Sequence, residues 1–127
     1  MIAGLVGLVA ACAADRAADR LTDKPTVVTV EAKEYAFVPA VLRFRAGQLY
    51  DLRLENVGKE THELTAPLFY AAAKIETPAV LSNENKEILV QPGETKDLIF
   101  RAPSPGTYDM RCADHDWAGM VGKIIVE

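Results

Sequence analysis

From Thr26 onward the sequence is a series of short segments in which apolar and polar residues alternate, and this pattern constrains the fold most. In YDLRLEN, for example, Tyr50, Leu52 and Leu54 alternate with polar residues, as in a strand with one face in the core. Pro- and Gly-containing turns separate several of the segments. The predicted strands are 26–32, 41–45, 50–56, 87–90, 96–101, 107–112 and 121–126. This spacing predicts an all-β fold, a Greek-key sandwich or barrel of about seven to eight strands.

One segment departs from the alternation. Residues 67–74, PLFYAAAK, combine good helix formers with Pro at the first position. The first residue of a helix does not use its N–H in a helical hydrogen bond, so proline, which lacks this N–H, is tolerated there. We therefore expect one short helical insertion in a connection between two strands.

The beginning of the sequence predicts export. Residues 2–14 carry no charge and are almost wholly apolar or small. They fall short of the ~20 residues that a membrane-spanning helix needs, but their length suits the apolar region of a signal peptide. The stretch contains Val9-Ala10-Ala11-Cys12, which resembles the lipobox of bacterial lipoproteins, in which the cysteine thiol carries the lipid. We expect a periplasmic or cell-envelope protein with Cys12 as candidate lipidation site; an ordinary secretory signal without an anchor is the alternative.

These features divide the chain into three parts: a signal peptide over 1–12, a polar tether over 13–25 and one domain over 26–127. The net charge of −4 lacks the basic excess of nucleic-acid-binding proteins, so we expect no such partner. Membrane contact is expected only through the lipid anchor, and the domain is expected to be a monomer. A domain of about 100 residues buries a sufficient core without disulfides.

The C-terminal block YDMRCADHDWAGMVGKIIVE concentrates side chains that bind metals. Cys112, His115 and Met120 form a C-x2-H-x4-M pattern between the last two predicted strands, so one loop can return His115 and Met120 toward the thiolate. His62, the only other histidine, follows an earlier strand. Two imidazoles, a thiolate and a weak axial thioether are the ligands of a mononuclear electron-transfer copper site.

Each of these residues alone has an ordinary structural explanation. A buried cysteine is usually a small hydrophobic residue, and a single histidine is usually a satisfied polar group. Zinc also accepts histidine and cysteine, but it does not usually recruit methionine. The joint occurrence of all four on a predicted β framework therefore favours copper.

With these residues identified, the chain resembles the cupredoxins, the family of type 1 copper proteins. The Cys-to-His and His-to-Met spacings are similar to those of plastocyanin and pseudoazurin. The resemblance covers about residues 26–127, and its main segments are Tyr35–Pro39, Ala46-Gly47, Asn56–Gly58, His62–Leu64, Pro92–Thr95, Pro105–Tyr108 and Cys112–Gly122.

The resemblance implies one copper ion held by His62, Cys112, His115 and Met120, with a long bond to the methionine. Glu63 stands where several such families have an asparagine that braces the ligand loop. The function implied is electron transfer by a Cu(I)/Cu(II) centre.

In this fold the C-terminal histidine reaches the surface through an apolar patch, so His115 and Trp117 are the candidate electron port. The expected partner is a redox protein such as a c-type cytochrome or an oxidase, steered to the patch by charge if it is basic. The acidic rim expected around the port comprises Glu60, Glu63, Asp114 and Asp116. The alternative is that these carboxylates are only solvated loop charges and that Trp117 only packs over the site.

Copper handling, meaning storage, delivery or resistance with the same site, is the alternative function. A closed Cys/His/His/Met site favours retention of the ion over exchange, and the ligand set makes a metal-free structural sandwich the weaker reading. We expect no enzyme: Cys112 and His115 lack a third group to orient the imidazole for nucleophilic catalysis. Multicopper oxidases and nitrite reductases need a second copper site, which two histidines cannot supply.

Overall fold

A computed structural model describes residues 24–127 of the chain. The predicted signal peptide over 1–12, which includes Cys12, lies outside the described residues, as does nearly all of the tether predicted over 13–25. Both remain predictions. Among the described residues, no helix combines the length and the apolar character that a membrane crossing requires.

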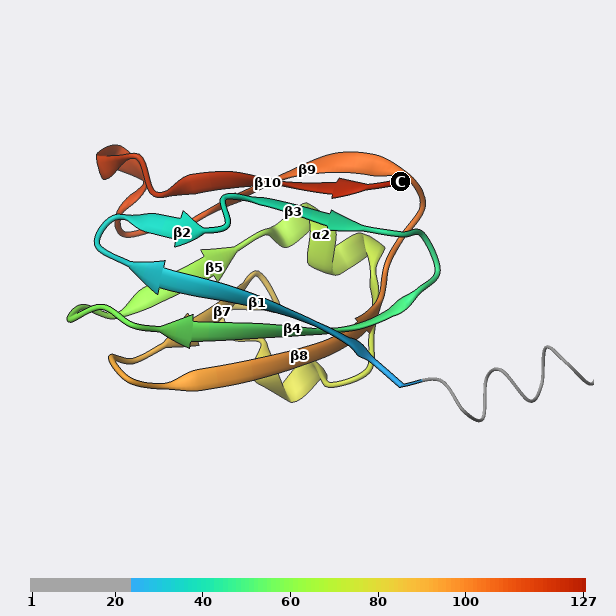
Figure 1. The fold of residues 1–127 in the computed structure, drawn as a ribbon, viewed down its shortest axis with the longest axis horizontal. Coiled ribbons are helices and arrows are strands. Elements are labelled where there is room, and N and C mark those ends of the chain that lie inside the picture. The colour runs from blue at the N-terminus through green and yellow to red at the C-terminus, as the bar shows by residue number, and fades with distance from the viewer. Residues whose placement is uncertain (1–23) are drawn as a thin grey trace, which may run out of the picture.

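Two five-stranded sheets pack against each other as a β-sandwich (Figure 1). The first sheet has, in order, β2 (Ala36–Val38), β1 (Thr26–Lys33), β4 (Leu49–Asn56), β8 (Thr95–Arg101) and β6 (Lys74–Ile75). The second has, in order, β3 (Val41–Phe44), β10 (Val121–Val126), β9 (Gly106–Arg111), β5 (His62–Thr65) and β7 (Glu87–Val90). This arrangement confirms the predicted all-β sandwich.

The pairing of β1 with β4 decides which loops meet at one end of the molecule. These strands run parallel, with Ala32 opposite Asn56, whereas most other neighbours are antiparallel. The turn after β1 and the loop after β4 therefore lie together at the end of the sandwich that carries the β9–β10 loop (Figure 1).

The apolar faces of the alternating strands fill the space between the sheets. Leu52 of β4 and Leu98 of β8 are paired in register, and both are fully buried. An aromatic cluster extends this core: the rings of Phe44 and Phe100 lie 5.2 Å apart, and Phe69 lies 5.9 Å from Phe44 and 5.3 Å from Phe100. Burial of such large rings supplies much of the folding free energy.

The helical insertion is also confirmed. Helix α2 (Pro67–Ala72) begins at the predicted proline and ends two residues earlier than predicted, because Lys74 already pairs with β8. Short 3-10 turns are η1 (Pro78–Val80) and η2 (Asp116–Ala118).

The described residues contain ten strands, whereas the sequence predicts about seven to eight. The three additional strands are β2, β5 and β6. β2 and β6 have only three and two residues, too few to show a period. All four residues of β5 are buried, so its sequence, HELT, does not alternate.

Candidate metal centre

Three side chains with metal-binding atoms converge at one end of the sandwich. His62 begins β5, Cys112 follows β9, and His115 precedes η2. The Cys112 Sγ lies 3.9 Å from Nδ1 of His62 and 3.4 Å from Nδ1 of His115, and the three ligand atoms lie within 4.8 Å of one another. His62 and Cys112 are fully buried, and the His115 side chain is 14% exposed. The structure thus brings together three of the four donors singled out in the sequence.

The loop from Cys112 to Met120 is closed by its own backbone. The Cys112 N–H donates to the Met120 carbonyl at 3.0 Å, and the His115 N–H donates to the Cys112 carbonyl at 3.1 Å. Gly119, with a φ of 88°, adopts the left-handed conformation that ends η2. The backbone of Met120 therefore lies beside that of Cys112, and the methionine side chain is fully buried.

The Cys112 sulfur makes two contacts with Glu63. The Glu63 backbone N–H donates to the sulfur at 3.4 Å, and the thiol lies 3.1 Å from Oε2 of the same residue, to which it can donate. Burial raises the pKa of Cys112 to about 11, and the Glu63 carboxyl adds to this rise. Burial also raises the pKa of Glu63 itself, with the neighbouring Asp114 contributing. In the metal-free protein the cysteine is therefore a neutral thiol at pH 7.

The second nitrogen of His62 lies near a carboxylate that no sequence motif identified. Nε2 of His62 lies 3.2 Å from Oε1 of Glu34, in the turn between β1 and β2. The same oxygen accepts the backbone N–H groups of Lys59 and Glu60, each at 2.7 Å. These hydrogen bonds, that from Glu60 above all, lower the pKa of Glu34 to about 2. Glu34 is therefore a fixed negative charge beside the imidazole.

Aromatic rings cover His115. The ring of Tyr35 lies 4.9 Å from the His115 ring and 6.0 Å from that of Trp117, measured between centroids. Trp117 is 77% exposed, and its indole N–H donates to the Asp114 carbonyl at 2.9 Å. Trp117 thus lies at the surface and His115 is largely buried, while Tyr35, which no sequence pattern assigned to this patch, lies near both rings.

The expected acidic rim is only partly present. Glu60 and Asp114 are exposed. Asp116 is partly buried, and its Oδ2 lies 4.0 Å from a guanidinium nitrogen of Arg111. Glu63 is buried against Cys112, so its assignment to the rim is wrong. Its position follows from β5, all of whose residues are buried.

Asn56, the last residue of β4, braces the loop that leads to His62. Its buried side-chain amide donates to the carbonyls of Glu60 and Val90, at 2.8 and 2.9 Å, and its Oδ1 accepts the Gly58 N–H at 2.9 Å. This position belongs to one of the motifs that carried the family resemblance. Asn56 and Glu34 therefore both form hydrogen bonds with the backbone of this loop.

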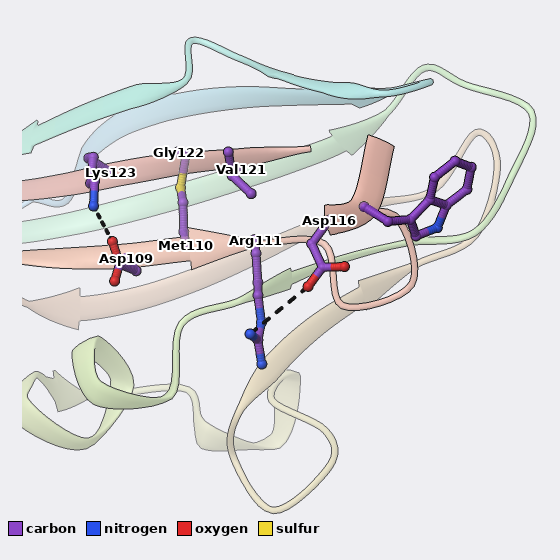
Figure 2. A pocket seen from close by; sticks show the side chains of 8 residues that line it. Asp109, Met110, Arg111, Asp116, Val121, Gly122 and Lys123 are labelled. Carbon is purple, nitrogen blue, oxygen red and sulfur yellow. Dashed lines mark hydrogen bonds and ion pairs between the residues drawn. The ribbon is translucent and has the colours of Figure 1, made fainter. Parts of the chain in front are cut away.

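A groove lies on the neighbouring part of β9 and β10 (Figure 2). Its volume is about 590 Å³, and Met110 and Val121 contribute apolar surface to it. Two pairs of opposite charge, Asp109 with Lys123 and Arg111 with Asp116, also line it (Figure 2). None of its lining residues is a histidine or a cysteine, so the metal-binding chemistry of the described residues lies in the cluster around Cys112.

Comparison with known proteins places these features in a family. The model of the cupredoxin-like domain matches residues 2–126 of the chain. Plastocyanin of Solanum crispum is 32% identical over 96 residues, which cover 72% of this chain and 87% of that protein. The chloroplastic major plastocyanin isoform of Arabidopsis thaliana is 42% identical over 48 residues, a match that covers 38% of this chain and 28% of that protein.

Solved structures show the same fold. Auracyanin A, a "blue" copper protein of Chloroflexus aurantiacus, is 22% identical with a TM-score of 0.60, covering 82% of this chain and all of that one. The copper-containing nitrite reductase of Thermus scotoductus is 26% identical with a TM-score of 0.57, covering 82% of this chain and 28% of that one. A multi-copper oxidase of Pseudomonas thermotolerans is 17% identical with a TM-score of 0.64, covering 84% of this chain and 30% of that one. The fold therefore occurs both alone and within larger proteins.

Proposed function

Because the chain belongs to the cupredoxin family, we propose that it is an electron carrier whose copper ion is held by His62, Cys112 and His115, with Met120 as a weak fourth ligand. The observation that carries this proposal is the convergence of the first three donors within 4.8 Å at a largely buried position. One thiolate and two imidazoles form a donor set that suits both oxidation states of copper. The bound ion supplies one-electron chemistry, as Cu(I) or Cu(II).

The protein contributes a site with a fixed shape. His62 is anchored in β5, and its loop is pinned by Asn56. The Cys112–Met120 backbone hydrogen bond holds the second ligand loop closed. A scaffold that changes little between the two oxidation states keeps the reorganisation on electron transfer small. Burial of His62 and Cys112 also favours retention of the ion over its delivery elsewhere.

Cys112 must lose its proton when the metal binds. Its thiol is neutral at pH 7 in the metal-free protein, because burial raises its pKa to about 11. Copper uptake therefore releases a proton, and apparent copper affinity increases with pH over the neutral range.

Electrons are proposed to enter and leave through the surface above His115. Tyr35 and Trp117 form an aromatic face there, and Trp117 is the more exposed of the two. A redox protein such as a c-type cytochrome or an oxidase would dock on this face. The exposed carboxylates of Glu60 and Asp114 favour a partner with a basic surface.

The cell envelope is the proposed location. Support for it comes from the uncharged apolar stretch over residues 2–14 of the sequence. Lipidation of Cys12 is part of the same proposal and is tested by mass spectrometry of the mature protein: an unmodified Cys12, or its loss with the signal, would contradict it.

The chain is proposed to act as a carrier rather than as an enzyme. Similar domains occur within a nitrite reductase and a multi-copper oxidase, both much longer than this chain. Both histidines of this sequence lie in the one cluster. A second copper centre with imidazole ligands would therefore need histidines from outside these 127 residues.

The visible and EPR spectra of the Cu(II)-loaded chain test the proposal. We expect an intense thiolate-to-copper charge-transfer band and a narrow copper hyperfine splitting. Cys112→Ser should abolish both, whereas the matched variant Cys12→Ser should keep both. A colourless protein, or weak tetragonal Cu(II) signals that survive Cys112→Ser, would contradict a type 1 centre.

A further inference from the structure

We propose that Glu34 is a positioning residue of the metal centre: its carboxylate fixes the His62 imidazole for binding through Nδ1, and its negative charge favours Cu(II) over Cu(I). The role assigned to Glu34 rests on the proposed copper function.

The two nitrogens of His62 face different groups. Nδ1 lies 3.9 Å from the Cys112 sulfur, and Nε2 lies 3.2 Å from Oε1 of Glu34. The imidazole thus bridges the donor cluster and the carboxylate, and it is fully buried. A ligand histidine that donates its other N–H to a carboxylate has a fixed tautomer and orientation, and it is a more basic ligand. The geometry assigns this role to Glu34.

The carboxylate is itself held in place by the ligand loop. Its Oε1 accepts two backbone N–H groups, from Lys59 and Glu60, at 2.7 Å each. Gly58 leaves the space that the carboxylate occupies, since a Cβ at that position would lie 2.5 Å from Oε1. Three consecutive residues of the loop are therefore shaped around one side chain from the β1–β2 turn.

The charge acts in the same direction as the hydrogen bond. With the Glu34 carboxylate at Nε2 and the donor cluster at Nδ1, its negative charge would stabilise the more highly charged ion, Cu(II), held by that cluster. A more basic imidazole also binds Cu(II) more strongly. Both effects lower the reduction potential of the centre.

A second carboxylate near the cluster provides a comparison. Oε2 of Glu60 lies 3.7 Å from Nε2 of His115, too far for a hydrogen bond, and its side chain is 48% exposed. Each ligand imidazole thus has a carboxylate nearby, but only Glu34 is fixed by backbone donors. Water and salt screen the charge of an exposed carboxylate more strongly than that of a partly buried one such as Glu34, whose side chain is 27% exposed.

The first test uses the metal-free protein. The ¹⁵N–¹H NMR signals of His62 should show the proton on Nε2 in the wild-type chain and in Glu34→Gln, whose amide oxygen can still accept it. Glu34→Ala should give a mixture of tautomers. A proton on Nδ1 in the wild-type chain, or an unchanged single tautomer in Glu34→Ala, would overturn the positioning role.

The second test measures the reduction potential and the Cu(II) affinity. Glu34→Gln should raise the potential and weaken Cu(II) binding, on the order of 10- to 100-fold. The matched control is Glu31→Gln, which removes the same charge three residues earlier, at an outward-facing position of β1. It should leave both quantities unchanged. An equal effect of the two variants, or none in Glu34→Gln, would overturn the electrostatic role.

The two tests separate this role from the proposed function. If the wild-type chain shows no type 1 spectrum, the proposed function fails, and the NMR result still decides whether Glu34 orients His62. If the spectrum is present and the potential of Glu34→Gln equals that of the wild type, only the role of Glu34 in setting the potential fails. Urea unfolding shows whether Glu34→Ala is folded. If it is not, the measurements on the nearly isosteric Glu34→Gln still test the role of Glu34.

Discussion

The sulfur of Cys112 lies 3.1 Å from Oε2 of Glu63, the residue that directly follows His62 in the chain. The carboxyl group therefore belongs to the surroundings of the sulfur and not to the molecular surface. A carboxylate beside a sulfur opposes formation of the thiolate.

The first prediction concerns this contact. Glu63→Gln should lower the pKa of Cys112 from about 11, because the carboxyl is one of the causes of the rise. Burial is the largest cause and persists, so the pKa should stay above the ordinary value of 9.0. The measurement is the ultraviolet thiolate absorbance of the metal-free protein against pH. Glu60→Gln, a carboxyl near His115 instead, is the control, and an equal change in both variants would contradict the prediction.

The second prediction concerns the stability of the metal-free protein at alkaline pH. The pKa of Cys112 is raised from 9.0 to about 11, so the fold favours the neutral thiol and the unfolded chain loses its proton first. The resulting stabilisation is complete below pH 9 and is lost as the pH rises toward 11. Urea unfolding should therefore show a steeper decline in this range for the wild type than for Cys112→Ser, which does not titrate. Parallel declines would show that the folded thiol has an ordinary pKa.

The third prediction concerns the space beside Glu34. Gly58→Ala should displace the Glu34 carboxylate, because the new Cβ would lie 2.5 Å from Oε1. Without changing any charge, the variant should alter the His62 tautomer and raise the reduction potential, as loss of the Glu34 contact would. Gly106→Ala is the control, since its nearest new contact is an ordinary 3.7 Å, to Tyr108. If the Gly58 variant behaves like this control, the loop does not fix the carboxylate.

The fourth prediction concerns the aromatic face over His115. Trp117→Ala should slow electron exchange with a cationic redox protein, while leaving the unfolding midpoint nearly unchanged because the side chain is 77% exposed. Leu68→Ala removes a side chain that is 76% exposed on α2 and should have no effect on the rate. Stopped-flow kinetics provide the measurement.

The same kinetics test the contribution of charge. The rate with a cationic partner should fall as ionic strength rises, because salt screens the carboxylates of Glu60 and Asp114. A rate that does not depend on salt would exclude electrostatic steering. Equal slowing by Trp117→Ala and Leu68→Ala would show that the redox partner does not dock on the aromatic face over His115.

Features that depend on local order could be predicted from the amino-acid sequence. Alternation identified the longer strands, because one face of each, such as that of Leu52 and Leu54, lies in the core. Pro67 marked the start of the helix, since it can only be accommodated in the first turn. The Cys112–Met120 segment was recognisable because its donors lie within nine residues and one closed loop brings them together.

The groups that surround those donors, by contrast, depend on contacts between distant parts of the chain. Glu34 is 28 residues from His62, and Glu63 is 49 residues from Cys112. Neither contact leaves a local pattern. The parallel register of β1 with β4, in which Ala32 faces Asn56, places the Glu34–Tyr35 turn beside the loop that leads to His62. Strand register depends on the packing of whole sheet faces. For this reason the proposed ligands could be predicted from short motifs, whereas the contacts of Glu34, Tyr35 and Glu63 with them could not.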